Sequence, residues 1–137
     1  MATIYVAMSR ALASWGADVG LTKHIYKVGV ADGPAGAAVA GLNAAAEAGQ
    51  TDWKHVADRD AGGLDEATVL ARLARRERAI DPALYPKIKG ARGLFKVKPG
   101  NVENHILVKR AFEDAEIKAV VVKPADVGGY LIANALD

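Results

Sequence analysis

The side chains most able to do chemistry in this sequence are cations that gather in one segment. Between residues 70 and 98, nine basic residues stand against only two acidic ones, although the formal net charge of the whole chain is +2. The nine are Arg72, Arg75, Arg76, Arg78, Lys87, Lys89, Arg92, Lys96 and Lys98. A local excess of Lys and Arg attracts polyanions, so the segment indicates a nucleic-acid surface. A solvated helix face explains the same charges equally well, and both interpretations stay open.

Other candidates for catalysis or metal binding are few. The sequence has no cysteine, which excludes disulfides, thiolate metal sites and a cysteine nucleophile. Its three histidines, His24, His55 and His105, lie on separate predicted elements without the spacing of a zinc site. The turn at residues 33–36 lacks the pattern of a nucleotide-binding loop, and a turn that starts a helix is the simpler interpretation.

The sequence carries no sign of secretion or of membrane insertion. Its first residues lack the basic start and long apolar run of a signal peptide. No segment approaches the roughly 20 apolar residues that cross a bilayer. We therefore expect a cytoplasmic location and no membrane partner, while the oligomeric state is not indicated.

The elements that must position these side chains follow from the apolar pattern, and residues 1–137 fit one domain. Apolar β-formers predict strands over residues 3–8 and 24–31, which should pair antiparallel. Residues 9–23 are interpreted mostly as a long connection, with room for one helical turn. An alanine-rich helix over residues 35–48 should begin after Pro34, because proline fits the first helical turn. Residues 53–57 predict a third strand.

The second half of the chain predicts more helix than strand. The clearest helix is expected over residues 64–80, where Leu70, Leu73, Glu77 and Ile80 share one face. After it we expect a strand over 94–97, a helix over 101–114, a buried strand over 118–123 and a final helix that opens at Pro124. The simplest arrangement is an α/β fold in which a small mixed β-sheet is covered by helices.

Two predicted strands resemble the motifs of the GIY-YIG endonuclease superfamily. Ile4-Tyr5 stands where the first motif would lie, with Thr3 in place of its glycine. Residues 26–29, Tyr-Lys-Val-Gly, are similar to the second motif in its phage-type form, and residues 94–97, Leu-Phe-Lys-Val, resemble a late strand of that branch. The resemblance covers residues 3–112, so residues 113–137 would be a C-terminal β-α extension of a β-β-α-β-α core.

The resemblance implies a phosphodiester site with one part missing. Tyr5 and Tyr26 would lie near the scissile phosphate, and Glu77 or Glu66 would hold a divalent metal such as Mg²⁺. The arginine expected on the helix after the second motif is absent, since residues 35–39 contain no basic residue. The resemblance therefore implies a domain that binds DNA with weak or absent phosphodiester hydrolysis. The implied nucleic-acid contacts are Lys27, Arg72, Arg75, Arg76, Arg78, Lys87, Lys89 and Arg92.

The choice of glutamate stays open at this point. Glu77 lies on the apolar face of its predicted helix, where a carboxylate must find a partner or face a groove. Glu66 lies in the first turn, where an acidic side chain is most simply explained by the helix dipole. A strict alignment with the family places Ala71 near the expected position.

A second function from another class also fits the sequence. The domain would be a non-catalytic protein-interaction or regulatory module whose basic segment is merely solvated. Convergence of the basic side chains on the face of Tyr5 and Tyr26 would favour nucleic acid, and scattering of those side chains would favour the module.

Overall fold

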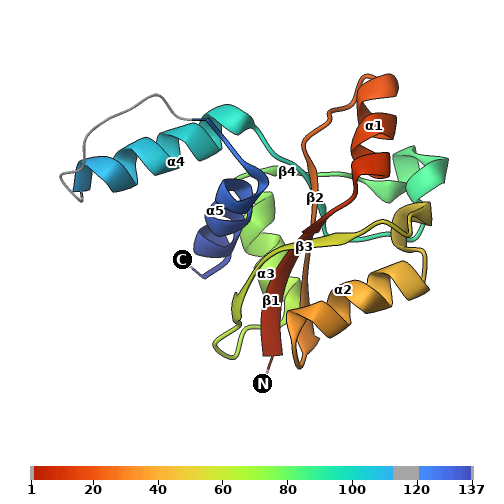
Figure 1. Ribbon diagram of the computed structural model, residues 1–137, viewed down its shortest axis with the longest axis horizontal. Coiled ribbons are helices and arrows are strands. Elements are labelled where there is room, and N and C mark those ends of the chain that lie inside the picture. Colours follow the sequence, from red (N-terminus) through yellow and green to blue (C-terminus); the bar gives the residue numbers. More distant parts are fainter. Residues whose placement is uncertain (1, 113–120, 137) are drawn as a thin grey trace.

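The computed structural model describes residues 2–112 and 121–136, and its centre is one antiparallel sheet. The strands are β1 (Ala2–Met8), β2 (Ile25–Asp32), β3 (Lys54–Asp60), β4 (Arg78–Ala79) and β5 (Leu94–Lys96). Their order in the sheet is β3-β1-β2-β5-β4 (Figure 1). The expected small sheet covered by helices is confirmed, with the refinement that each pairing among the described strands is antiparallel.

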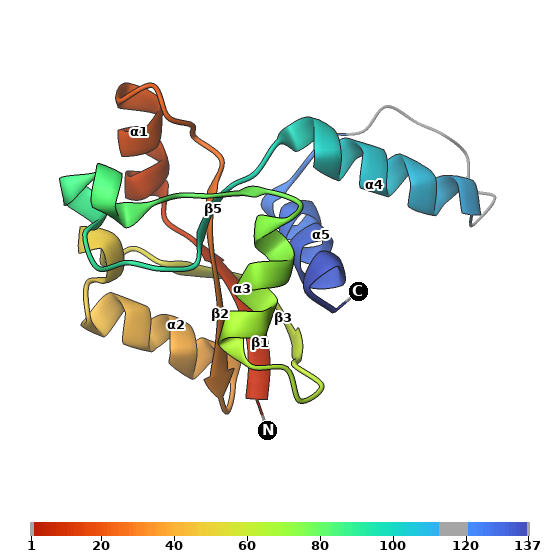
Figure 2. The same cartoon turned by 180° about the vertical axis from the view of Figure 1, so that it is seen from behind.

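Helices cover both faces of this sheet. They are α1 (Arg10–Asp18), α2 (Ala35–Ala44), α3 (Glu66–Ala74), α4 (Pro99–Phe112) and α5 (Pro124–Leu136). Short 3₁₀ turns occur at η1 (Glu47–Gly49), η2 (Pro82–Leu84) and η3 (Pro86–Ile88). Helices α1 and α2 lie on one side of the central strands and α3 and α5 on the other, while α4 extends outward (Figures 1 and 2). We call these two sides the α1/α2 face and the α3/α5 face.

Successive side chains along β1 and β2 contribute alternately to two separate hydrophobic cores, one on each face of the sheet. Ile4 and Val6 of β1 belong to the core under α3 and α5, together with Tyr26 and Val28 of β2. Tyr5 of β1 belongs to the core on the other face, under α1 and α2. Because successive residues of a strand point to opposite faces, a strand buried on both sides reads as a continuous apolar run.

The connection between β1 and β2 contains a nine-residue helix, α1, so the expectation of a mostly irregular loop was wrong. Ser9 caps the helix by accepting a hydrogen bond from the Leu12 amide at 3.1 Å. The Asp52 carboxylate, distant in sequence, accepts a second one from the Ala11 amide at 3.0 Å and one from the Ser9 hydroxyl. Because this second cap comes from a residue distant in sequence, local sequence patterns underestimate how much of the connection is helical.

The helix expected over residues 64–80 ends at Ala74, so the prediction was wrong at its C-terminal end. Its start is capped by Asp65, whose carboxylate accepts the Thr68 amide at 2.8 Å. Beyond Ala74 the chain turns into the short strand β4, and the Ile80 amide donates to the Leu94 carbonyl at 2.8 Å. Pairing with β5 therefore replaces the last turns of helix that the apolar spacing predicted.

The C-terminal helix is confirmed, and a glycine sets its distance from the sheet. A Cβ atom placed on Gly128 would lie 2.8 Å from both the Ala57 Cβ and the Val56 Cγ1 on β3. The preceding strand, expected over residues 118–123, lies outside the described residues up to 120. Residues 121–123 are not in a strand, and Val121 is 74% exposed.

The contact between Gly128 and β3 predicts opposite effects of two neighbouring substitutions. Gly128→Ala should lower the free energy of unfolding by roughly 1–3 kcal/mol, because the added methyl overpacks the contact. Gly129→Ala is the matched control, since Gly129 is exposed and its added methyl meets no atom within 4 Å. It should raise stability by roughly 0.5–1 kcal/mol through helix propensity. Urea unfolding measures both, and equal effects of the two substitutions would contradict the packing explanation.

Candidate functional site

The sheet separates the two tyrosines that the sequence places at a catalytic site. Tyr5 is buried on the α1/α2 face and Tyr26 on the α3/α5 face. In the β1–β2 register, Tyr5 lies opposite Gly29 and Ala7 lies opposite Lys27. The side chain that shares the face of Tyr5 is therefore that of Lys27. The two tyrosines are not brought together.

The ring of Tyr5 lies across the backbone of Gly29. A Cβ atom at residue 29 would come within 2.6 Å of Tyr5 Cζ and 2.8 Å of Tyr5 Cε1. A glycine is thus needed opposite the tyrosine for a steric reason, because any larger residue would displace the ring.

Three charged side chains, Glu47, Glu66 and Arg92, surround Tyr5 and Lys27. We call these five residues together with Gly29 the Tyr5 cluster. Lys27 Nζ donates to the Arg92 carbonyl and lies 3.8 Å from Glu47 Oε1. Arg92 Nη2 lies 3.3 Å from Glu66 Oε2. Glu66 Oε1 accepts the Val30 amide at 3.1 Å, on the part of β2 that extends beyond β5. Residues from two strands, η1, α3 and a loop therefore meet at one place.

The electrostatics of this cluster keep Tyr5 protonated. Burial first, and then the negative charges of Glu66 and Glu47, against the opposing charge of Arg92, raise the pKa of Tyr5 to about 12. Burial lowers the pKa of Lys27, against the opposing effect of Glu47 and Glu66. A general base works best when its pKa lies near the operating pH. Tyr5 is therefore suited to donate a hydrogen bond and unsuited to take a proton from water at neutral pH.

The Glu77 carboxylate, expected on an apolar face, is buried and has hydrogen-bond partners within the protein. Its side chain is 4% exposed. Its Oε1 accepts hydrogen bonds from Tyr130 Oη at 2.7 Å and Asn101 Nδ2 at 2.9 Å, and its Oε2 accepts the Lys98 amide at 3.2 Å. Burial, followed by the hydrogen bond and negative charge of Glu77, raises the pKa of Tyr130 to about 12. Glu77 thereby links the segment that follows α3 to the start of α4 and to α5.

Metal ligation would need carboxylates that these contacts already engage. Both oxygens of Glu77 and both oxygens of Glu66 have partners within the protein. Over residues 2–112 and 121–136, no group of three or more His, Asp or Glu side chains is arranged to hold a metal ion.

The basic side chains of residues 70–98 separate into groups with different environments. Arg72 donates from Nη1 to the Ala135 carbonyl at 2.9 Å and so ties α3 to α5. Arg92 belongs to the Tyr5 cluster, and Lys87 and Lys89 are exposed on and after η3. The convergence on the tyrosine face that would favour nucleic acid is therefore limited to Arg92.

The remaining cations gather at the β4–β5 edge of the sheet. They line two adjoining hollows of about 330 and 440 Å³, which share Arg76 and Asn101. We call this surface the basic edge and define it by Arg75, Arg76, Arg78, Lys96, Lys98 and Asn101. Among the described residues that line it, only the buried Glu77 carries a carboxylate. Lys96 and Lys98 were predicted only as members of the basic segment, and Asn101 was not predicted as a contact. The signal that could have placed them together is the pairing of β4 with β5.

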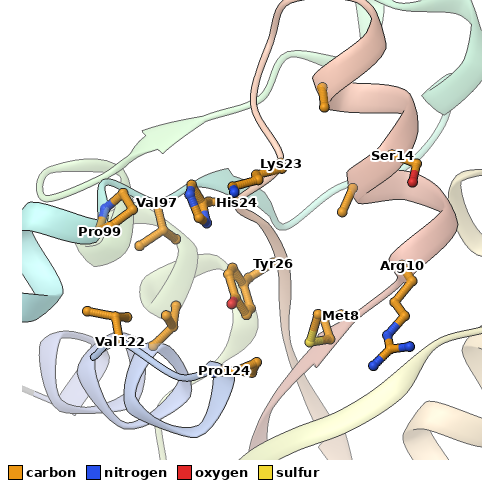
Figure 3. A pocket seen from close by; sticks show the side chains of 13 residues that line it. Met8, Arg10, Ser14, Lys23, His24, Tyr26, Val97, Pro99, Val122 and Pro124 are labelled. Atoms are coloured by element: carbon orange, nitrogen blue, oxygen red, sulfur yellow. The ribbon is translucent and has the colours of Figure 1, made fainter. Parts of the chain in front are cut away.

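A third hollow lies beside Tyr26, on the opposite side of the sheet from Tyr5. It is a cavity of about 660 Å³ between α1, the start of β2, the end of β5 and the start of α5 (Figure 3). Burial raises the pKa of Tyr26, whose ring forms part of the wall. No sequence pattern indicates this cavity, because its walls come from elements far apart along the chain.

Comparisons of the chain with protein-family models, curated proteins and solved structures found no match. Within the described part of the chain, no helix combines the length and the apolar character needed to span a membrane.

The bonds of Glu77 predict a structural role for its carboxylate. Glu77→Ala should lower the free energy of unfolding by about 1–3 kcal/mol for each buried donor left without a partner, Tyr130 Oη foremost. Glu103→Ala, an exposed position on α4, should stay within about 0.5 kcal/mol of the parent protein. Urea unfolding in the presence and absence of Mg²⁺ tests this, and a stabilisation by Mg²⁺ that Glu77→Ala abolishes would instead indicate a metal ligand.

The raised pKa of Tyr5 predicts how stability changes at high pH. The folded protein keeps the Tyr5 proton up to a pH of about 12, whereas the unfolded chain loses it near 10.0. The resulting stabilisation is complete below pH 10 and is lost as the pH rises toward 12. Tyr5→Phe should therefore show a shallower loss of stability over this range, while Tyr85→Phe should follow the parent. The test is the urea midpoint of each protein measured across this pH range. Parallel plots of midpoint against pH for Tyr5→Phe and for the parent would refute the prediction.

Proposed function

We propose that this chain is a nucleic-acid-binding domain that holds the phosphate backbone of DNA at its basic edge. We further propose that it is a diverged GIY-YIG-like domain, of the phage-type branch, whose phosphodiester hydrolysis is weak or absent. A cytoplasmic location, expected from the sequence, goes with this proposal.

The observation that carries the proposal is a pair of like charges across two strands. Arg78 on β4 lies directly opposite Lys96 on β5 in the antiparallel register. Like charges in this position destabilise a sheet, by roughly 0.2–1 kcal/mol. The arrangement costs the free protein stability, and a bound polyanion would convert the repulsion into attraction for both side chains.

The surroundings of this pair suit a phosphate backbone. Arg75, Arg76 and Lys98 add further positive charge around the same two hollows. Asn101, Asn104 and His105 line them as well, and such side chains commonly hydrogen-bond to phosphate and sugar oxygens. The surface is therefore suited to contacts that position DNA, with few groups that would read its sequence.

The Tyr5 cluster supports the GIY-YIG-like part of the proposal. Strand β1 pairs antiparallel with β2 on one side and β3 on the other, and α2 follows β2, as the resemblance requires. Glu66 and Arg92 lie with Tyr5, so a carboxylate and a guanidinium accompany the first-motif tyrosine.

The same cluster explains why hydrolysis should be weak. Lys27 occupies the place beside Tyr5, while Tyr26 points to the opposite face. The oxygens of Glu66 and Glu77 are engaged by protein donors, so neither carboxylate fits the role of a ligand for Mg²⁺ in this arrangement. The basic edge lies at the far end of α3 from Glu66, a helix of nine residues and so roughly 13 Å long. The basic edge, proposed to bind DNA, and the position expected for catalysis would thus lie apart.

Titration of a labelled DNA duplex at several salt concentrations tests the proposal. The double variant Arg78→Gln, Lys96→Gln should bind more weakly and reduce the slope of log K against log salt by roughly 2, since each lost phosphate contact contributes about 0.9. Removing the repulsion should also make the free variant slightly more stable than the parent. Lys87→Gln, Lys89→Gln removes the same charge from exposed positions outside the basic edge and should leave the slope nearly unchanged.

Other outcomes of this experiment would redirect the function. Equal weakening by both double variants would indicate attraction by net charge alone. No binding at low salt would leave the non-catalytic interaction module as the better function. Cleavage of the duplex that depends on Mg²⁺ would show that hydrolysis has been retained.

A further inference from the structure

The cavity beside Tyr26 is separate from the surface proposed for DNA. None of the cations of the basic edge lines it. Its volume of about 660 Å³ falls in the range of small-molecule sites, roughly 300–1,000 Å³. Figure 3 shows the ring of Tyr26 between the α1 side of the cavity, with Arg10 and Ser14, and the α5 side, with Val122 and Pro124.

The deep wall of this cavity is apolar and firmly held. Tyr26, Val97 and Val127 form part of it, and each is at most 5% exposed within the core under α3 and α5. These side chains are fixed by packing on their other sides, so the wall is preformed. A site of this kind offers an apolar surface to a ligand without having to order its own side chains first.

Helix α1 keeps the opposite wall open by presenting small side chains. Arg10, Ala13, Ser14 and Ala17 line the cavity at i, i+3, i+4 and i+7, which is one face of a helix. Apart from Arg10 at its end, this face carries only methyl and hydroxyl groups. Larger residues at the alanine positions would fill the space.

The charged groups at the cavity are basic. Arg10, Lys23 and His24 line it, and none of the carboxylates within residues 2–112 and 121–136 does. Two acidic side chains at the starts of α1 and α5 are used as helix caps: Asp52 accepts the Ala11 amide, and Asp126 accepts the Lys123 amide at 2.9 Å. Burial, and then the charge of Lys23, lowers the pKa of His24.

We propose that this cavity binds a small amphipathic carboxylate. The apolar body of the ligand would lie against Tyr26, Val97 and Val127, and its carboxylate would be held at the mouth by Lys23 and the ring of His24. The complementarity is one of both shape and charge: an apolar wall suits an apolar body, and a mouth lined by Arg10, Lys23 and His24 suits an anionic head group. This site does not rest on the proposed DNA function, since it uses other residues on another part of the surface.

Titration of the isotope-labelled chain with decanoate, followed by amide NMR shifts, tests the site directly. Saturable shifts should appear at residues 10–17, 23–26, 97 and 127, and decanol and decylammonium should bind more weakly than decanoate. Lys23→Gln should raise the Kd for decanoate by about tenfold, because one charge-assisted contact is lost. Lys89→Gln removes the same charge outside the cavity and should leave the Kd unchanged.

A second pair of variants tests the apolar space. Ala17→Leu adds bulk to the cavity wall and should abolish saturable binding. Ala11→Leu makes the same change at another exposed alanine of α1, outside the cavity, and should leave binding unchanged. The spectra themselves report whether each variant is folded. Shifts that persist in Ala17→Leu, decanol binding as tightly as decanoate, or no saturable shifts at millimolar decanoate would each overturn the proposal.

Discussion

Both faces of the central strands β1 and β2 are covered by helices, and most features of the molecule depend on this constraint. Each inward position of either strand must be apolar or satisfied by a partner, whichever face it points to. Ile4 and Val28 serve the α3/α5 face, and Tyr5 and Lys27 serve the α1/α2 face. The strict alternation then decides which side chains can meet. It places a buried lysine beside Tyr5 and carries Tyr26 through the sheet to a different environment.

The polar groups that this burial creates are satisfied by side chains from far along the sequence. Lys27 is met by the Arg92 carbonyl and by Glu47, and Glu77 accepts three hydrogen bonds from residues 98, 101 and 130. Such networks hold the ends of elements together where apolar packing is thin. They also engage the oxygens of Glu66 and Glu77, the two carboxylates that the sequence offered as metal ligands.

The two surfaces proposed to bind ligands both carry positively charged side chains. At the basic edge, Arg78 and Lys96 face each other across paired strands, and the mouth of the cavity beside Tyr26 is lined by Arg10, Lys23 and His24. The two surfaces differ in the shape that carries the charge. The first is an open edge, suited to an extended polyanion, and the second encloses an apolar volume, suited to a small ligand with one anionic group.

Sequence alone determined the local features of this protein: the apolar strands, the helix start after Pro34, the existence of a helix from about residue 64, the antiparallel pairing of the first two strands and the concentration of positive charge in residues 70–98. Only the tertiary structure decided where α3 ends, because pairing of β4 with β5 overrides the helical spacing through Ile80. Tertiary structure also made Glu77 a buried link and left Glu66 as the carboxylate beside Tyr5. Local propensity acts within a few residues, whereas hydrogen bonds and burial join residues dozens of positions apart, and those long-range contacts set the chemistry of each site.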